Sequence, residues 1–156
     1  MKKLLVVILM VMNICLFSET FQGIVTKVYD GDSIHVLVHG AEILKIRFYG
    51  IDAPELDQEF GKTSRDFLKI YLLTETVTIE NMGLDRYGRT LGIIFFGGEC
   101  INWKMIDRGF AHVYKQYCQE PWEDIWVEAE RIARLEKKGL WYQDVIIFPW
   151  DWRKKK

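Results

Sequence analysis

The stretch "YDGDSIHVLVHGAEILKIRFYG" (residues 29–50) decides the fold, because it contains two apolar segments with strict alternation, joined by a short glycine turn. Alternation of apolar and polar side chains is typical of a half-buried strand. The inward-facing residues predicted for these two strands are Ile34, Val36, Val38, Leu44, Ile46 and Phe48. Another β-branched segment, residues 21–29, precedes the turn Asp30-Gly31-Asp32, so the sequence predicts an antiparallel meander of three strands.

Outward from this meander, helical spacing of apolar residues predicts a helix over residues 61–73, with Thr63 or Ser64 as its cap. Two further strands are predicted at 75–81 and 89–96, and a short helix at 101–109. Five strands with a helix between the third and fourth are the layout of an OB-fold. The predicted fold class is therefore α+β, mainly β: a five-stranded OB-fold barrel with about three helices.

The last helix is predicted from Pro121 to Gly139, with acidic residues in its first turn and basic residues near its end, as the helix dipole favours. Its predicted buried residues are Trp122, Ile125, Trp126, Ala129, Ile132 and Ala133. An aromatic tail, "LWYQDVIIFPWDW" (140–152), follows and is expected to pack back onto the domain. The final "RKKK" (153–156) is interpreted as a solvated tail.

The first 18 residues differ in character from the rest of this 156-residue chain, because Lys2 and Lys3 precede an apolar run from Leu4 to Phe17. A basic start and a short apolar run indicate a signal peptide, and the run is shorter than the roughly 20 residues that span a bilayer. We therefore expect residues 1–18 to be a signal peptide or N-terminal anchor on one domain, residues 20–156. This predicts an exported protein, secreted or periplasmic, with membrane contact through residues 1–18 only.

The charge of the chain excludes one class of nucleic-acid binder. Without residues 1–18, 19 Lys and Arg face 22 Asp and Glu, a net charge of −3. Such a protein does not attract nucleic acid by bulk positive charge, so any nucleic-acid role needs a local site. Cys100 and Cys118 remain in that part, and the sequence leaves open whether they form a disulfide.

Three carboxylates lie where strands begin or end: Asp32 heads a strand, and Asp52 and Glu55 follow one; Asp85 is a fourth, weaker candidate. Carboxylates brought together repel one another unless a cation lies between them. Oxygen ligands without nearby His or Cys suit calcium or magnesium rather than zinc. An EF-hand is excluded, because Ile34 and His35 stand where that loop needs an oxygen ligand and a glycine. The ligands would therefore come from distant segments.

Two arginines supply the complementary charge: Arg47 on the third predicted strand, at the outer face, and Arg89 at the end of "DRYGR". An arginine fork binds two phosphate oxygens and stabilises added negative charge. Either residue alone would be read as an ordinary surface arginine.

In combination, "YDGDS", "IRFYGIDAPE", "LDRYGRTLG" and "IDRGFAHVY" resemble the staphylococcal (thermonuclease-like) nuclease family over roughly residues 21–141. The resemblance implies a calcium-dependent nuclease that cleaves DNA and RNA by in-line attack of an activated water. Its implied roles are calcium binding by Asp32, Asp52 and the Ala53 carbonyl, and catalysis by Arg47, Glu55 and Arg89. Tyr87 matches a tyrosine near the terminal phosphate, and Tyr114 or Tyr117 the aromatic residue that stacks on a base.

The stretch "LDQEFGKTSRDF" (56–67) is shorter and less basic than in the best-known member, so the balance of endonuclease and exonuclease action stays open. The implied substrates are single-stranded DNA and RNA; no stable protein partner is implied, and a monomer is expected. Two alternatives remain: an OB-fold module that binds oligonucleotides without cutting them, and a structural envelope protein.

Overall fold

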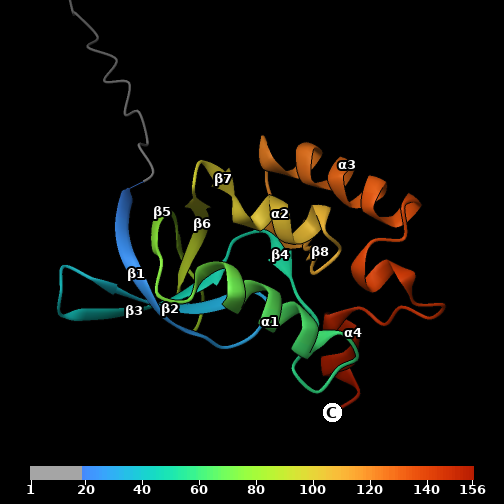
Figure 1. Ribbon diagram of the computed structural model, residues 1–156. Coiled ribbons are helices and arrows are strands. Elements are labelled where there is room, and N and C mark those ends of the chain that lie inside the picture. Colours follow the sequence, from blue (N-terminus) through green and yellow to red (C-terminus); the bar gives the residue numbers. More distant parts are fainter. Residues whose placement is uncertain (1–18) are drawn as a thin grey trace, which may run out of the picture.

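A closed barrel of five strands forms the body of the protein in a computed structural model that describes residues 19–156. The strands are β1 (Thr20–Val28), β2 (Ser33–Val38), β3 (Glu42–Phe48), β5 (Thr76–Leu84) and β6 (Thr90–Phe96). They pair antiparallel in the order β3-β2-β1-β5-β6, and parallel pairing of β3 with β6 closes the barrel. Figure 1 shows this barrel with helix α1 (Gly61–Leu72) lying across it. The predicted OB-fold is confirmed.

The barrel interior follows the alternation seen in the sequence. Ile34, Val36 and Val38 of β2 are all buried, as are Ile46 and Phe48 of β3. Tyr49, which the alternation places on the outer side, is also buried, because the chain leaves the barrel wall there. The Tyr49 ring packs edge-on against Trp126, and its hydroxyl accepts a hydrogen bond from Gln119 N–H at 3.0 Å.

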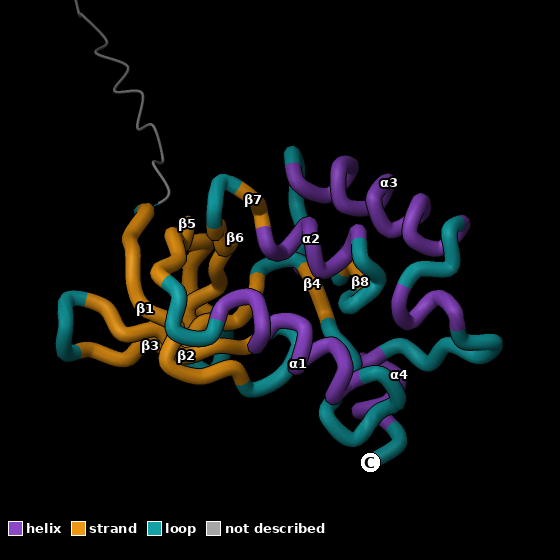
Figure 2. Tube along the Cα trace, in the orientation of Figure 1, coloured by secondary structure: helices purple, strands orange, loops and turns teal. Residues whose placement is uncertain are grey.

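Helices gather on the side of the molecule away from the hairpin of β2 and β3, as Figure 2 shows. They are α2 (Ile101–Asp107), α3 (Trp122–Leu135) and the short α4 (Pro149–Lys154), with 3-10 turns η1 (Lys115–Tyr117) and η2 (Gly139–Tyr142). Three two-residue strands complete the structure: β4 (Ile51–Asp52), β7 (Glu99–Cys100) and β8 (His112–Val113). The sequence predicts α1, α2 and α3 but not α4, which spans the end of the aromatic tail and the start of the "RKKK" segment.

The predicted cap of α1 is wrong. The residue before the helix is Phe60, in the left-handed region at φ 70°, and no side chain caps the helix. Ser64 is fully buried instead, and its hydroxyl donates to the carbonyl of Phe110 at 2.6 Å. The hydroxyl therefore ties α1 to the segment before β8 rather than to its own first turn.

Helix α3 buries a narrower stripe than predicted. Trp126, Ala129 and Ala133 are buried, whereas Ile125 and Ile132 are exposed. The helix contacts α2, β8 and η2, with Trp126 against Tyr49 and Ala133 against Leu140 and Trp141. It also ends at Leu135, four residues before the predicted stop at Gly139.

The aromatic tail packs back onto the domain, as predicted. Leu140 and Trp141 of η2 form a second small core with Ala133 of α3, covered by Phe60, Ile146 and Phe148. Cys100 and Cys118 are both free thiols. Among residues 19–156, no helix is long and apolar enough to cross a membrane. The predicted signal peptide or anchor, residues 1–18, lies outside the described residues.

Candidate catalytic and metal-binding site

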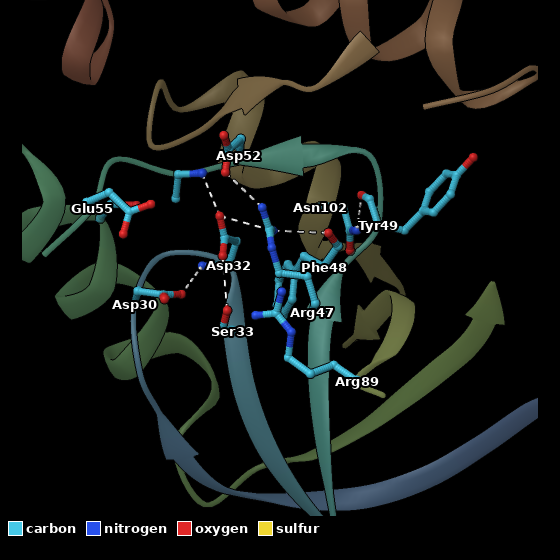
Figure 3. A network of polar contacts seen from close by, with 12 residues as sticks. Asp30, Asp32, Ser33, Arg47, Phe48, Tyr49, Asp52, Glu55, Arg89 and Asn102 are labelled. Atoms are coloured by element: carbon cyan, nitrogen blue, oxygen red, sulfur yellow. Dashed lines mark hydrogen bonds and ion pairs between the residues drawn. The ribbon is translucent and has the colours of Figure 1, made fainter. Parts of the chain in front are cut away.

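Three segments bring charged residues together at one end of the barrel. Asp32 immediately precedes β2, Arg47 lies near the end of β3, and Asp52 ends β4. The β2–β3 register sets Ser33 opposite Arg47, which places Asp32 beside that arginine. Figure 3 shows the two aspartates and Arg47 pointing toward one another.

Arg47 bridges the two aspartates. One terminal nitrogen lies 3.0 Å from Asp32 Oδ2 and the other 2.8 Å from Asp52 Oδ1. Asp32 Oδ2 also accepts the backbone N–H of Ala53 at 2.6 Å, which fixes the strand end that carries Asp52. The side chain of Arg47 is only 13 % exposed. On the outer face of β3, it therefore lies in a largely buried ionic cluster.

This cluster holds more negative charge than a buried environment favours. Asp32 and Asp52 are 5 % and 1 % exposed. Burial, together with the neighbouring charge of Asp32, raises the pKa of Asp52 to about 6, against the opposing effect of its arginine partners. Burial and the charge of Asp32 likewise raise the pKa of Asp30 to about 7. A group of buried carboxyls with raised pKa values is typical of a site that binds a cation or performs chemistry.

Glu55 lies three residues beyond Asp52, at the rim of the cluster, with a third of its side chain exposed. Its backbone N–H donates to Gln58 Oε1 at 3.1 Å. Gly61, the first residue of α1, packs against the carbonyl of Glu55 so closely that a Cβ there would overlap it. The start of α1 therefore fixes the loop that presents Glu55 at the rim of the cluster.

Arg89 immediately precedes β6, the strand that pairs with β3, and its side chain extends toward Arg47 in Figure 3. Asp85 holds it: one carboxylate oxygen accepts the backbone N–H groups of Tyr87 and Arg89 at 2.8 and 2.9 Å, and the other accepts Arg89 Nε at 2.7 Å. Partial burial raises the pKa of Asp85, but these hydrogen bonds outweigh it and leave the pKa below its usual value. The sequence singled out Asp85 as a weaker ligand candidate; its contacts make it the residue that orients Arg89.

The three predicted tyrosines are less closely associated with the cluster. Tyr87 is 70 % exposed beside Arg86 and Arg89, whose guanidinium carbons lie 4.8 and 5.7 Å from its ring centre. Tyr114 and Tyr117 pack edge to face, with ring centres 4.7 Å apart, and Tyr117 is the more exposed. Both follow β8, which pairs with the strand that carries Asp52.

Arg153, in the "RKKK" segment that was interpreted as a solvated tail, belongs to the cluster. Its terminal nitrogens lie 2.8 Å from Asp52 Oδ2 and 2.7 Å from Glu55 Oε1. These ion pairs raise the pKa of its guanidinium, against the opposing effect of burial. All four residues of this segment are exposed, as a solvated tail requires, but Arg153 is also bound to the cluster. No local signal in the sequence could have shown this contact, since it joins residues 101 positions apart.

The donors of this site suit a hard cation. Asp32 and Asp52 offer carboxylate oxygens, and the Ala53 main chain adjoins both. Within residues 19–156, no three His, Cys, Asp or Glu side chains are grouped to hold a metal by themselves. Oxygen ligands from two carboxylates, completed by main-chain oxygen and water, fit calcium or magnesium rather than zinc.

Together, the fold and the site define a small β-barrel that presents guanidinium groups and carboxylates side by side, as a protein that handles a phosphate anion and a hard cation requires. The family model described as staphylococcal nuclease homologue matches residues 45–143. The chain belongs to the staphylococcal nuclease family.

Curated relatives carry names in agreement with this family. An "Uncharacterized endonuclease" of Escherichia coli O157:H7 is 34 % identical over the full length of both chains. An "Uncharacterized endonuclease" of Haemophilus influenzae is 36 % identical over 84 % of this chain and 72 % of its own length. A "Micrococcal nuclease" of Shigella flexneri is 36 % identical over 86 % of this chain and 81 % of its own.

Proposed function

We propose that this protein is a calcium-dependent nuclease that hydrolyses phosphodiester bonds in DNA and RNA. One observation carries the proposal: in a chain of the staphylococcal nuclease family, Arg47 bridges the buried Asp32 and Asp52 at the barrel end where Glu55 and Arg89 also lie. All five residues are those that the sequence motifs single out.

Asp32 and Asp52, with the main-chain carbonyl of Ala53, would hold the calcium ion. When bound, the ion supplies Lewis-acid stabilisation of the charge that develops on the phosphate. Burial, with the charge of Asp32, raises the pKa of Asp52, and this supports the assignment because a bound divalent cation would stabilise the ionised carboxylates.

Arg47 and Arg89 bind the scissile phosphate in this proposal. Asp85 binds Arg89 only at Nε. Within residues 19–156, the two terminal nitrogens of Arg89 therefore remain available to a ligand. Arg47 has five N–H donors, and a phosphate competes with the aspartates for them once a metal ion neutralises those carboxylates. Both guanidinium groups would then screen the phosphate against an anionic nucleophile.

Glu55 would position the attacking water and accept its proton. It is the most exposed carboxylate of the set, so a solvent water can reach it. The water oxygen forms a bond to phosphorus in line with the leaving oxygen, which departs with the bonding electrons. The proton from the water passes to Glu55 and the leaving oxygen is protonated from solvent.

Single-stranded DNA and RNA are the proposed substrates, because a base on an unpaired strand can stack on an aromatic ring whatever its identity. Tyr87, Tyr114 and Tyr117 are the proposed contacts. We also propose that the protein acts as an exported monomer, with residues 1–18 as signal peptide or anchor.

The test is cleavage of a fluorescent single-stranded DNA by the purified protein, with calcium and with an excess of chelator. Glu55→Gln and Arg89→Ala should each lower the rate about 100-fold or more, since each removes a contact made in the transition state. Arg86→Ala, which removes an arginine three residues from Arg89, is the matched control and should keep most of the activity. Wild-type rates in both site variants would contradict the assignment, and a clear binding isotherm with intact substrate would favour a non-catalytic binding module.

A further inference from the structure

The C-terminal helix α4 lies against the loop that joins β4 to α1, which is the loop that carries Glu55 (Figure 1). Several contacts outside the ionic cluster fasten this segment. Trp152 Nε1 donates to Asp57 at 3.2 Å, and Lys156 lies 2.5 Å from the other oxygen of the same carboxylate. Gln58 Nε2 donates to the carbonyl of Ile147 at 2.5 Å. The segment is therefore bound to this loop at a defined position.

Arg153 and Arg47 together take up most of the hydrogen-bonding capacity of Asp52. Its two terminal nitrogens lie 3.2 and 2.8 Å from the two carboxylate oxygens, and Arg47 lies 2.8 Å from the first of them. A carboxylate has about four lone-pair positions, so these three bonds leave one. A metal ion that binds Asp52 must therefore compete with Arg153 for the same oxygens.

The same segment covers an aromatic residue of the proposed substrate site. The Trp150 ring stacks on Tyr114, with ring centres 5.3 Å apart and an angle of 13° between the planes. Trp150 stacks in turn on Phe148, at 4.6 Å and 8°. A nucleic-acid base that stacks on this face of Tyr114 would have to replace Trp150.

We propose that residues 148–156 form an inhibitory segment, in which Arg153 occupies the carboxylates of the calcium site and Trp150 occupies the base-stacking face of Tyr114. The proposal rests on the proposed nuclease function and concerns regulation of that same site. Arg153 is 42 % exposed, so the segment is accessible enough for calcium and substrate to displace it together. The calcium concentration that activates the enzyme is then set by its own C-terminus.

The test compares calcium affinity of the full-length protein and its variants by isothermal titration calorimetry without nucleic acid. Arg153→Gln removes the competing charge and should tighten calcium binding about tenfold. This factor corresponds to the free energy of one charge-assisted hydrogen bond. Lys154→Gln is the matched control: it makes the same charge change on the next residue and should alter the affinity less than about twofold. Among residues 19–156, the only ion pair of Lys154 is with Asp151. Equal affinities in the two variants would overturn the proposal.

Asp57→Ala removes both carboxylate oxygens that hold Trp152 and Lys156, and gives a second test that does not depend on a residue touching Asp52. Loss of a negative charge near the site should weaken calcium binding by simple electrostatics, whereas release of Trp152 and Lys156 should tighten it. The proposal requires the tightening, and a weakened affinity contradicts it.

Cleavage rates separate this inference from the function on which it rests. Arg153→Gln should cleave faster than the parent protein at low calcium and at the same rate when calcium saturates both. A slower rate at saturating calcium would show that Arg153 serves the substrate, which overturns the inhibitory role and leaves the nuclease assignment intact. A parent protein that neither binds calcium nor cleaves with it contradicts the proposed function itself.

Discussion

Asp30 and Asp32 stand two residues apart, yet their carboxyl groups have different tasks. Asp30 Oδ1 accepts the backbone N–H of Asp32 at 3.0 Å, which shapes the turn. Asp32 faces Arg47 and the N–H of Ala53. Asn at position 30 keeps the accepting oxygen, and the raised pKa of Asp30, about 7, means that loss of its charge costs little.

The pair therefore gives a matched prediction. Asp30→Asn should keep cleavage within about threefold of the parent rate, while Asp32→Asn should lose about 100-fold or more and weaken calcium binding, because a metal carboxylate is gone. Steady-state rates with single-stranded DNA, together with melting temperatures that show both variants folded, check it. Equal losses would mean that the two carboxylates share one role.

At this scale the sequence predicts residues whose partners are set by strand register. Asp32 and Arg47 are brought together by the hairpin of β2 and β3, whereas the grouping of both with Asp52 as one site came from the family resemblance. The place of Arg153 could not be predicted, because its contact depends on how the last helix and the tail fold back. The sequence identifies Asp85 only as an acidic residue near the motif. Its role in orienting Arg89 depends on hydrogen bonds within the loop that residue spacing does not specify.

Among the elements, the strands were more predictable than the helix ends. Period-two alternation fixes which face of a strand is buried, and β2 follows it fully. Helix α1 begins one residue after a left-handed Phe60, a conformation that no sequence rule would assign to that residue. Helix α3 exposes Ile125 and Ile132, because apolar spacing shows which residues share a face but not how much of that face the neighbouring elements cover.

Helix α2 is joined to the barrel by a buried asparagine. Asn102 Oδ1 accepts the N–H of Ile94, and its amide nitrogen donates to the carbonyls of Tyr49 and Gly92 at 3.0 and 3.1 Å. These bonds link α2 to β6 and to the end of β3, and β3 and β6 are the two strands whose pairing closes the barrel. Nothing in the sequence distinguishes this asparagine from a surface residue.

Asn102→Ala should lower the free energy of unfolding by about 3 kcal/mol, since it leaves buried backbone groups unpaired. For a domain of this size that corresponds to a drop of roughly 6 to 12 °C in melting temperature. Gln22→Ala, which removes a single exposed side-chain bond to Thr78, is the control and should change the melting temperature by no more than about 2 °C. Similar melting temperatures for the two variants would show that Asn102 does not hold the barrel closed.

In the molecule as a whole, barrel, helices and tail meet at His112. This residue lies on β8, whose backbone pairs with β4, and its ring packs against Trp141, Phe148 and Trp150 of the tail. The charged groups that face it belong to α3: Glu130 Oε1 is 3.8 Å from His112 Nδ1, and Arg134 binds the other oxygen of Glu130. Burial, with the added charge of Arg134, lowers the pKa of His112 to about 3.

This junction predicts how the stability of the whole molecule depends on pH. Unfolded His112 takes up a proton below its ordinary pKa of 6.5, while the folded residue stays neutral down to about 3. The unfolded state therefore binds more protons in that window, so the free energy of unfolding falls as the pH falls, by about 2 kcal/mol between pH 7.5 and 5.

Replacement of His112 by Phe removes this contribution and keeps the aromatic packing. Nδ1 has no hydrogen-bond partner in the described part of the chain, so His112→Phe breaks no buried bond at that atom. Urea unfolding of parent and variant at several pH values isolates the histidine, because the carboxyl groups are common to both proteins. The difference in stability should shift in favour of the variant as the pH is lowered, and a difference independent of pH would mean that His112 is protonated alike in the folded and unfolded states.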